Sequence, residues 1–450
     1  MDPIPYSNPV ERRICDQATR DLVPINAIFE LTPLCNMNCD MCFVRLSPGE
    51  MHARGSLLPV SAWISLADEL KSRGTLFVLL TGGEPLTYPG FRELYLHLME
   101  LGMILTINTN GTLIDEDWVR FFEANRPRRI NITLYGKDAD TYEKLCHHRE
   151  GYERAIHAIR ALHEVGVDVK VNGSITPSNV GDLQELVDQV EQIGCYWKFD
   201  TYMYPASRER GRDFASDSRL SPADAARARV ALMKRRAVSR EDFLQMAASY
   251  LHTVANTRPL PGPQLVGCRA GKSSFCVNWQ GKMRPCVIMT EPEVELIATE
   301  EAEKDENAMD RQEEAEKDEN AVDRQEETRE SGAPETSFAA NHNVLRDFAA
   351  ANRYVLSDFT AAWEQLVSAM HSHHLSPACS TCPGREVCIT CAACGWSEEG
   401  AIEARPRYVC EYTRETVRLL EQEYAAFGQL GPVETFPKVV HNRPVGDVDK

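Results

Sequence analysis

Short apolar segments alternate with amphipathic segments six times between Ile25 and about Thr201, and this repetition constrains the fold more than any other feature of the chain. The apolar segments have the length of buried strands, and the amphipathic segments have the period of helices. Such β/α repeats have right-handed crossovers, which produce a parallel sheet covered by helices. Six repeats are fewer than the eight of a closed barrel. The sequence therefore predicts an α/β fold built on an open, partial (β/α)6 barrel.

The individual elements follow from the same pattern. Strands are expected at residues 27–32, 75–81, 103–108, 130–134, 167–175 and 196–201. Helices are expected at residues 61–73, 95–101, 115–124, 152–165 and 180–193. Gly102, Gly166 and Gly194 follow three of these helices, as is typical of a helix end. Residues 220–257 indicate a linking helical region, and residues 411–427 a further amphipathic helix.

Composition divides the chain further. The expected units are an N-terminal extension (1–24), the partial barrel (25–215), a helical linker (216–264), a small cysteine-rich domain (265–427) and a C-terminal tail (428–450). Within the cysteine-rich domain, the 13-residue sequence at 300–312 is repeated almost unchanged at 313–325. Its few aliphatic residues cannot offset the entropy of ordering the chain. We therefore expect a disordered acidic insert at 291–335, with a docking segment as the alternative.

The net charge of −18 says little about the ligand, because it is concentrated in the insert. Residues 291–330 contain 18 acidic and 5 basic side chains, a local charge of −13, which leaves −5 for the rest of the chain. This balance argues against a general nucleic-acid binder, which needs a basic face. The N-terminus has no apolar signal sequence, and no apolar run approaches the ~18 residues of a membrane helix. A cytoplasmic protein without membrane or nucleic-acid partners is expected.

In a reducing cytoplasm, clustered thiols indicate metal or cluster ligands before disulfides. Cys35, Cys39 and Cys42 follow the first strand at spacings of x3 and x2. The loop beyond the carboxyl end of such a strand is where catalytic groups collect. Three thiolates on one loop can hold three corners of a cubane iron–sulfur cluster and leave the fourth iron open. The alternatives are a zinc knuckle and buried core cysteines, but no nearby fourth ligand completes a tetrahedral zinc site.

The second strand ends in Thr81-Gly82-Gly83-Glu84-Pro85. Two residues without Cβ atoms let the backbone approach a ligand closely, and Glu84 can accept a hydrogen bond from an ammonium group. Together with the CxxxCxxC loop one strand earlier, this sequence resembles the radical S-adenosylmethionine (radical SAM) superfamily. The resemblance implies that SAM binds the open iron and that reductive cleavage yields a 5′-deoxyadenosyl radical, which abstracts hydrogen from the substrate. It also implies that this loop receives the methionyl ammonium of SAM.

The resemblance implies further SAM contacts, which are weaker assignments. The aromatic residue that ends the cysteine motif is Phe43, and Pro85 completes the GGEP motif. Asn110 lies in the Thr-Asn-Gly sequence that ends the third strand, where relatives often show the same residues. Thr133 on the fourth strand and Asn172 or Ser174 on the fifth occupy positions of polar SAM contacts. Many relatives have SxDG on the fourth strand, where this chain has Thr133-Leu134-Tyr135-Gly136, so we assign no catalytic role to Tyr135.

Nine of the fifteen cysteines lie between residues 268 and 410. Their spacing resembles the SPASM extension of radical SAM enzymes, which carries two auxiliary [4Fe–4S] clusters. The resemblance assigns one cluster to Cys379, Cys382, Cys388 and Cys410. It assigns the other to Cys268, Cys286, either Cys391 or Cys394, and Cys276 as the natural fourth ligand, with a core thiol as the alternative for Cys276. Zinc corners are the competing interpretation, and Cys15, Cys146 and Cys195 are expected to have no ligand role.

SPASM-type relatives mostly modify peptides, so the resemblance implies a peptide or protein substrate, matured by crosslinking or decarboxylation. An electron donor such as ferredoxin or flavodoxin is implied with it. The roughly 25 residues before the first strand are too few for a leader-recognition domain. Candidate polar groups near the substrate are Lys198, Asp200, Tyr202 and Tyr204, and a basic run contains Arg208, Arg210 and Arg212. The rivals are a small-molecule radical SAM enzyme, of a carbohydrate or tetrapyrrole pathway, and a non-enzymatic zinc scaffold.

Overall fold

A nine-stranded sheet organises the molecule, with the strand order β6-β5-β4-β3-β2-β1-β7-β8-β9. This computed structural model describes residues 9–205, 218–262, 267–300 and 353–426. Six strands of the sheet are the parallel ones of the β/α repeats: β1 (Asn26–Glu30), β2 (Phe77–Thr81), β3 (Ile104–Thr109), β4 (Arg129–Thr133), β5 (Val169–Ser174) and β6 (Tyr196–Asp200). The predicted open, partial barrel is confirmed, and its edge at β6 is unpaired in the described residues.

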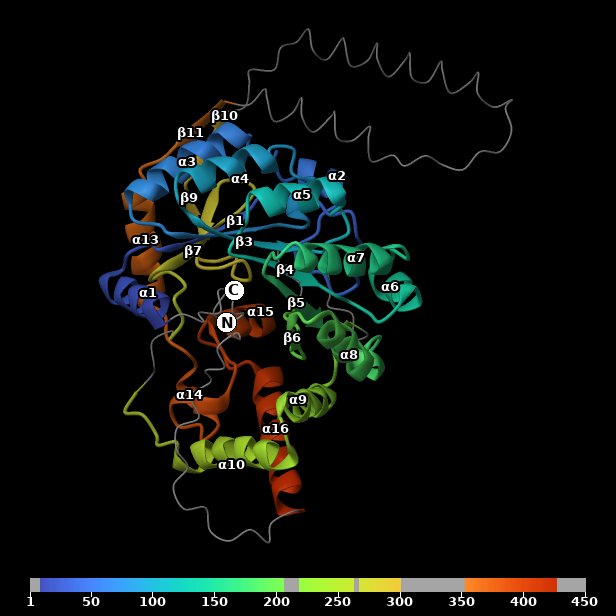
Figure 1. The fold of residues 1–450 in the computed structure, drawn as a ribbon. Coiled ribbons are helices and arrows are strands. Elements are labelled where there is room, and N and C mark those ends of the chain that lie inside the picture. The colour runs from blue at the N-terminus through green and yellow to red at the C-terminus, as the bar shows by residue number, and fades with distance from the viewer. Residues whose placement is uncertain (1–8, 206–217, 263–266, 301–352, 427–450) are drawn as a thin grey trace.

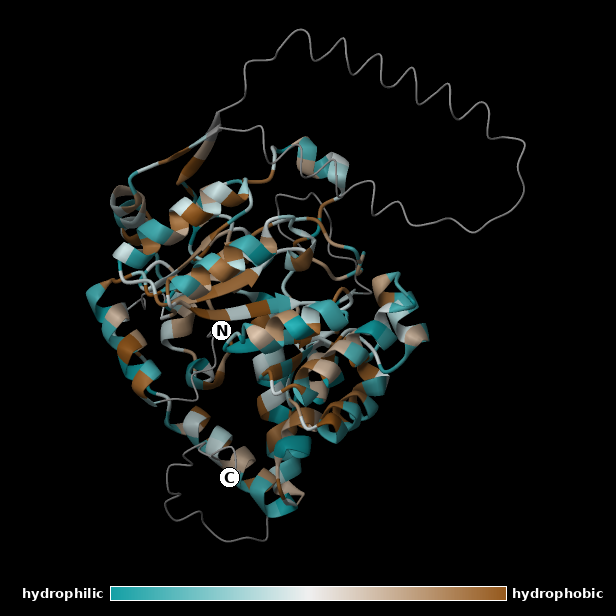
Figure 2. Cartoon of the chain, turned by 45° about the horizontal axis from the view of Figure 1, so that its top comes forward, coloured by the Kyte–Doolittle hydropathy of each residue, from teal (hydrophilic) through white to brown (hydrophobic). Residues whose placement is uncertain are grey.

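Helices from the β/α repeats cover the outer face of this curved sheet (Figure 1). They are α3 (Val60–Ser72), α4 (Phe91–Glu100), α5 (Glu116–Ala124), α6 (Ala139–Cys146), α7 (Gly151–Glu164) and α8 (Leu183–Ile193). Phe29 of β1, for example, packs on Trp63 of α3 with ring centroids 4.8 Å apart. Figure 2 shows the strands of the sheet as predominantly hydrophobic, as expected for strands buried between helices and the barrel interior.

Local sequence explains where these helices begin and end. The Asp115 carboxylate accepts the backbone N–H groups of Asp117 and Trp118 and so caps the start of α5. Gly194 ends α8 with a left-handed φ of 89°, which a residue with a side chain adopts at a cost. The sequence analysis placed α8 and α5 within a few residues and missed α6, a short helix that follows β4.

The N-terminal segment contains a helix that the sequence analysis left as an extension. This helix, α1 (Pro9–Asp21), buries Cys15 and Ala18 against Ile25 and Phe77 at the amino-terminal end of β1 and β2. Burial of this apolar face stabilises the helix, whose exposed side is mostly polar but includes Val10 and Ile14.

The sheet continues beyond β1 into the cysteine-rich region. Strand β7 (Ser274–Val277) pairs parallel with β1, and β8 (Lys282–Arg284) and β9 (Val294–Glu295) follow in antiparallel order. A two-stranded ladder joins β10 (Ile297–Glu300) to β11 (Arg353–Leu356). Residues 291–300, expected to belong to the disordered insert, are therefore ordered here, because Val294, Leu296 and Ile297 are buried. The tandem repeat itself lies almost entirely outside the described residues.

A second group of helices lies beyond the β6 edge, on the far side of the sheet from α3 and α4 (Figure 1). It comprises α9 (Pro222–Arg236), α10 (Arg240–Asn256), α14 (Pro377–Ser380), α15 (Ala392–Glu399) and α16 (Arg407–Ala425). The predicted linking region is thus two helices, separated where Ser239 caps α10 by accepting the Asp242 N–H. Helix α13 (Phe359–His371) packs on β7 through Phe359 and Trp363. None of the helices in the described ranges has the length and apolar character needed to cross a membrane.

Candidate functional site

The CxxxCxxC loop lies directly beyond the carboxyl end of β1, and the short helix α2 (Pro48–His52) follows it. Backbone N–H groups point at two of its sulfurs: Met37 N to Cys35 Sγ at 3.4 Å and Arg45 N to Cys42 Sγ at 3.2 Å. Cys39 is buried, whereas Cys35 and Cys42 are half-buried. Burial raises the pKa of Cys35, and the nearby Glu84 carboxylate raises it further. The loop thus presents one buried and two half-buried cysteines, and cysteine thiolates are the usual ligands of iron–sulfur clusters.

The glycine pair that ends β2 packs against the backbone just before the cysteines. Gly83 N donates to Thr32 O at 2.7 Å, and Glu84 N donates to Leu34 O at 2.9 Å. A Cβ atom on Gly83 would lie 2.2 Å from Leu34 O. The sequence analysis expected the glycine backbone to approach a ligand. In the structure this backbone packs closely against residues 32–34 of the chain instead. The glycines join the β2 loop to the cysteine loop.

Glu84 is fully buried and braces the ends of β2 and β3. Its carboxylate accepts hydrogen bonds from Asn110 N at 2.7 Å, Thr109 Oγ1 at 2.8 Å and Leu86 N at 3.1 Å. Burial raises the pKa of Glu84 to about 7, although these three donors oppose the shift. Pro85 begins a single 3₁₀ turn (Pro85–Thr87) after it. The predicted contact between Glu84 and an ammonium group stays a prediction, while its role in holding the loops together is plain.

The loop after β3 completes the connection to the cysteines. The Asn110 amide donates to Asn36 Oδ1 at 2.9 Å and lies 3.7 Å from Cys35 Sγ. Thr112 in turn donates to Asn110 Oδ1 at 2.7 Å and accepts from the Asn36 amide at 2.8 Å. Asn110 therefore contacts the cysteine loop next to Cys35, and its contact with SAM stays a prediction.

Thr133 and Asn172 lie side by side, because they are register partners at the carboxyl ends of β4 and β5. A residue that the sequence analysis missed, Asn179, ties these strand ends together. Its buried amide donates to Tyr135 O at 2.7 Å and to Ser174 O at 2.9 Å. An asparagine five residues after a strand carries little signal in sequence, since most such residues are turn residues.

Two further residues lie against the cysteine loop. Tyr135, to which the sequence analysis assigned no catalytic role, is half-buried there, and desolvation and the nearby thiols raise the pKa of its phenol. Cys146, at the end of α6, is fully buried, and its thiol is a hydrogen-bond partner of Cys39. The sequence analysis expected no role for Cys146. Its position near the loop depends on α6, which the sequence pattern did not reveal.

Phe43 lies on the wall of a cavity of about 310 Å³ at the carboxyl ends of β1 and β7. Apolar residues such as Trp279 and Val287 line it together with charged ones. Arg284 is buried there and pairs with Glu293 through Nε at 2.6 Å. A cavity that joins the cysteine loop to the β7–β8 hairpin has the mixed lining of a ligand site.

The structure brings four cysteines of the C-terminal region together: Cys379, Cys382, Cys388 and Cys410. Burial raises the pKa of Cys379, and the other three thiols raise it further, to about 11. Two donors point at the group: Thr413 Oγ1 lies 3.3 Å from Cys388 Sγ, and Arg405 Nε lies 3.4 Å from Cys410 Sγ. The group matches the set that the SPASM resemblance assigns to one auxiliary cluster.

A second group contains Cys268, Cys286 and Cys391, which are electrostatic neighbours. Cys394 lies 3.7 Å from Cys391 Sγ, and Tyr204 Oη lies 3.6 Å from the same sulfur. Hydrogen bonds from Cys394 and Tyr204 lower the pKa of Cys391 to about 5. Of the two alternatives in the sequence, Cys391 is the electrostatic neighbour of both Cys268 and Cys286, which favours it, and the choice of ligand stays a prediction.

Cys276 lies apart from this group. It is fully buried on β7 and packs against Ile28, Leu79 and Val287 in the barrel interior. Cys286 is among its electrostatic neighbours. The core-thiol alternative describes this environment better, and the ligand assignment stays a prediction.

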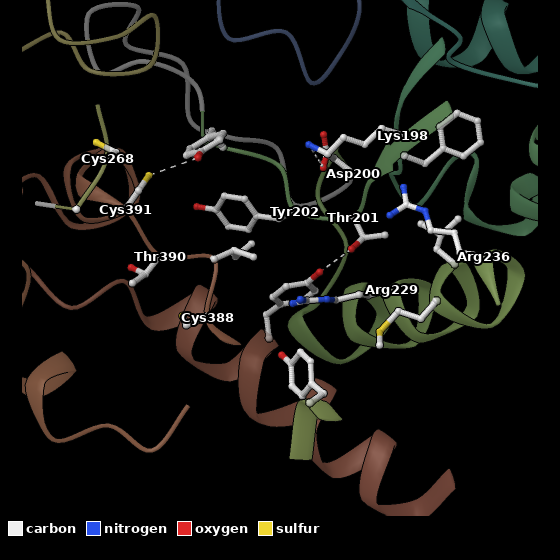
Figure 3. A pocket seen from close by; sticks show the side chains of 18 of the residues that line it. Lys198, Asp200, Thr201, Tyr202, Arg229, Arg236, Cys268, Cys388, Thr390 and Cys391 are labelled. Atoms are coloured by element: carbon white, nitrogen blue, oxygen red, sulfur yellow. Dashed lines mark hydrogen bonds and ion pairs between the residues drawn. The ribbon is translucent and has the colours of Figure 1, made fainter. Parts of the chain in front are cut away.

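A larger cavity, of about 600 Å³, separates the β6 edge from the two C-terminal cysteine groups. Figure 3 shows Lys198, Asp200 and Tyr202 on one side of it and three cysteines, Cys268, Cys388 and Cys391, on the other. Lys198 and Asp200 form an ion pair at 3.1 Å, and Tyr202 donates to the buried Glu398 carboxylate at 2.7 Å. The candidate residues at the end of β6 thus line one cavity. Arg208, Arg210 and Arg212 lie outside the described residues.

A site for a single metal ion, such as zinc, needs ligands that lie closer together than the cysteines of these groups. Among residues 9–205, 218–262, 267–300 and 353–426, no three His, Cys, Asp or Glu side chains converge closely enough to hold one metal ion. A zinc ion needs its ligands at about 2.0–2.3 Å. A cubane spreads its ligands over four irons, and the wider cysteine groups described above fit that donor set.

Comparison with known proteins identifies the barrel. Residues 29–190 match the family model described as the Radical SAM superfamily. Residues 29–190 are a radical SAM domain. Such a domain implies a [4Fe–4S] cluster and SAM, and the loop of Cys35, Cys39 and Cys42 lies inside the matched residues.

Two curated relatives show how far the sequence similarity extends. The antilisterial bacteriocin subtilosin biosynthesis protein AlbA of Bacillus subtilis is 23% identical over 267 residues, which are 59% of this chain and 55% of AlbA. An AdoMet-dependent heme synthase of Methanosarcina barkeri is 27% identical over 196 residues, 44% of this chain and 54% of the synthase. The chain thus spans about half the length of the curated relatives it matches.

Solved structures extend the similarity to the C-terminal region. The crystal structure of Streptococcus suis SuiB matches with a TM-score of 0.56 and 17% identity, over 89% of this chain and 81% of SuiB. At this identity the match shows a shared fold. The predicted arrangement, a partial barrel followed by a cysteine-rich domain as in radical SAM/SPASM enzymes, is confirmed.

Proposed function

We propose that this protein is a radical SAM/SPASM enzyme that reductively cleaves SAM and abstracts a hydrogen atom from a peptide or protein substrate. The observation that carries the proposal is the joining of three loops at the carboxyl ends of β1, β2 and β3. Glu84, Gly83 and Asn110 fix the cysteine loop from two sides.

The residues present fit a [4Fe–4S] cluster. Cys35, Cys39 and Cys42 would hold it, leaving one iron for SAM, and Glu84, Asn110, Thr133 and Asn172 lie on the loops and strand ends around that position. The bound cluster and SAM together would supply the radical that removes hydrogen from the substrate. The protein would position both, and burial of Cys39 and Glu84 would keep water from the reaction.

The two C-terminal cysteine groups support auxiliary clusters. Cys379, Cys382, Cys388 and Cys410 form a complete set of four ligands. Cys268, Cys286 and Cys391 form a set of three, with Tyr204 beside it. An electron donor such as ferredoxin or flavodoxin would supply reducing equivalents to the protein.

A peptide substrate is favoured by the large cavity and by the relatives. The cavity of about 600 Å³ is lined by aromatic and aliphatic side chains with a few charged groups, which suits a peptide segment. AlbA is named for biosynthesis of a bacteriocin, and one SuiB structure contains its precursor peptide. The similarity to the heme synthase supports a second candidate, a tetrapyrrole-type small molecule.

Anaerobic reconstitution tests the chemistry. We expect about twelve irons per chain for three cubanes and SAM-dependent release of 5′-deoxyadenosine. Replacing Cys35, Cys39 or Cys42 with Ala should abolish that release. Bound zinc without labile sulfide would contradict the proposal.

Coexpression with candidate precursor peptides, followed by mass spectrometry, tests the substrate class. Loss of two hydrogens would indicate a crosslink, and loss of carbon dioxide a decarboxylation. Turnover of a porphyrin precursor with no peptide modified would favour the second candidate.

A further inference from the structure

One face of α9 forms part of the wall of the larger cavity. Arg229, Leu232, Met233 and Arg236 all line the cavity. The last three follow the first by three, four and seven residues, which places all four on one side of the helix. Figure 3 shows both arginines on the side of the cavity away from Cys268 and Cys391. This face of α9 therefore presents two cations, with two apolar side chains between them in the sequence, to the cavity.

The described residues leave the charge of both arginines without an acid partner. The Arg229 guanidinium contacts the rings of Tyr250 and Tyr412, with centroids at 5.6 and 5.4 Å, and its buried Nη1 has no hydrogen-bond partner there. Arg236 lies over the Trp197 ring at 4.7 Å and forms no ion pair within the described part of the chain. Aromatic faces can hold a guanidinium in place and leave its N–H edge for an anion.

Strand β6 contributes the remaining charged groups of the described lining. Lys198 lines the cavity and pairs with Asp200, the one carboxylate on this lining, at 3.1 Å. Three cations therefore face the cavity with a single acid between them. We call Lys198, Arg229 and Arg236 the basic wall.

A fourth cation lies on the neighbouring strand. Lys170 of β5 is two residues before Asn172, the register partner of Lys198, and so it is on the same face of the sheet as Lys198. It is 8% exposed and forms no ion pair within the described ranges. Burial lowers the pKa of Lys170 to about 8, and nearby cations, of which Lys198 acts most strongly, lower it further against the effect of Asp200. Lys170 still carries most of its charge at neutral pH, so it adds to the positive charge of the basic wall.

We propose that the basic wall binds a carboxylate of the peptide substrate, from a Glu or Asp side chain or from the C-terminus. Arginine side chains recognise carboxylates with two parallel hydrogen bonds, and carboxylates are the ordinary anionic groups of a peptide at neutral pH. The contact anchors the peptide on the β6 side of the cavity. The residues next to the anchored carboxylate then lie between the edge of the barrel and the C-terminal cysteine groups.

Three synthetic tripeptides test the chemistry of the ligand on the reconstituted full-length protein. Acetyl-Ala-Glu-Ala-amide carries a side-chain carboxylate, acetyl-Ala-Gln-Ala carries a C-terminal one, and acetyl-Ala-Gln-Ala-amide carries none. Saturation-transfer NMR measures their affinities. At least one anionic peptide should bind about tenfold more tightly than the neutral one, as expected for hydrogen bonds to a charged group, and high salt should reduce this preference. The anionic peptide that binds more tightly identifies the source of the carboxylate, whereas equal affinities or no binding would overturn the proposal.

Variants of α9 test the location of the site. Arg229→Gln and Arg236→Gln should each weaken binding of the preferred anionic peptide about tenfold and leave the affinity of the neutral peptide unchanged. Arg236 is exposed, so its replacement should not disturb folding even where that of Arg229 does. Arg227→Gln is the matched control, because Arg227 lies on the same helix, pairs with Asp224 and does not line the cavity. An equal loss of affinity in the control, or no loss in Arg236→Gln, would contradict the proposal.

The inference rests on the proposed function in taking a peptide as the substrate. Protein that cleaves no SAM but still prefers an anionic tripeptide would refute the proposed function and leave the carboxylate site standing. Protein that cleaves SAM and modifies a peptide, but binds the three tripeptides equally, would refute the inference alone.

Discussion

The Glu84 carboxylate accepts the backbone N–H of Asn110 at 2.7 Å and thereby joins the carboxyl end of β2 to that of β3. Asn110 in turn reaches Asn36 and Cys35 with its side chain. One buried acid thus determines, through a single intermediate residue, where the first cysteine of the cluster loop lies.

This position makes Glu84 a source of pH-dependent stability. Because burial raises its pKa from about 4.5 to about 7, folding favours the protonated form. The stabilising contribution is complete below pH ~4.5 and is lost as the pH rises through ~7, a change of about 3 kcal/mol at 1.36 kcal/mol per pKa unit. Urea unfolding of cluster-free wild-type protein between pH 4.5 and 8 should show this decline. The Glu84→Gln variant should not show this fall in unfolding free energy, whereas the exposed control Glu143→Gln should show it. If Glu84→Gln shows the same fall as wild type, another group causes it.

Gly83→Ala should destabilise the protein, because its Cβ would lie 2.2 Å from Leu34 O and force the β2 loop away from the cysteine loop. Overpacking of this kind costs about 1–3 kcal/mol. The melting temperature and the iron bound after reconstitution should both fall. Gly181→Ala is the matched control, since nothing lies within 4 Å of its Cβ position. Equal melting temperatures for the two variants would contradict the packing role.

Asn110→Asp should weaken cluster binding, because it removes the amide that donates to Asn36 and lies near Cys35 and adds a negative charge beside the thiolates. Loss of a residue that orients a metal ligand typically costs 10–100-fold in metal affinity, and we expect about that loss in a competition assay with an iron chelator. Asn125→Asp, which changes an asparagine at the end of α5, should bind iron as wild type does. Normal iron affinity in Asn110→Asp would show that the contact is dispensable.

Glu398→Ala should loosen the junction between β6 and the C-terminal helices. The Glu398 carboxylate is nearly fully buried and accepts from Tyr202 at 2.7 Å and Arg219 at 2.9 Å. Its removal leaves a poorly solvated guanidinium without its acid, which costs roughly 3–5 kcal/mol. Differential scanning calorimetry should record a lower melting temperature. The neighbouring Glu399→Ala breaks a more exposed pair at 3.7 Å and should change stability by less than about 1 kcal/mol.

Much of the barrel was predictable because its signals are local. Each strand and helix of the β/α repeats has its own periodicity, and the CxxxCxxC and GGEP motifs sit at adjacent strand ends. The resemblance to the SPASM extension also separated the four-cysteine group around Cys379 from the group around Cys268. The structure favours Cys391 over Cys394 because Cys391 lies next to Cys268 and Cys286, a proximity that sequence spacing does not contain.

The misses share a different cause, since each depends on a contact between distant segments. Cys146 lies beside Cys39 only because α6 folds against the cysteine loop. Helix α1 was overlooked because its short apolar face becomes meaningful only against Ile25 and Phe77. The sequence around a residue does not show which distant segment will pack against it.

The β10–β11 ladder, finally, gives the fold a position that can accept insertions. The chain leaves the described fold at Glu300 and re-enters it at Arg353, and these two residues are antiparallel neighbours. Because the ladder fixes both ends, the architecture places no demand on the length of what lies between them. A fluorescent protein or an affinity tag inserted between Glu300 and Arg353 should leave the distant cysteine loop undisturbed. Replacing the whole repeat by a tight turn should leave it undisturbed as well.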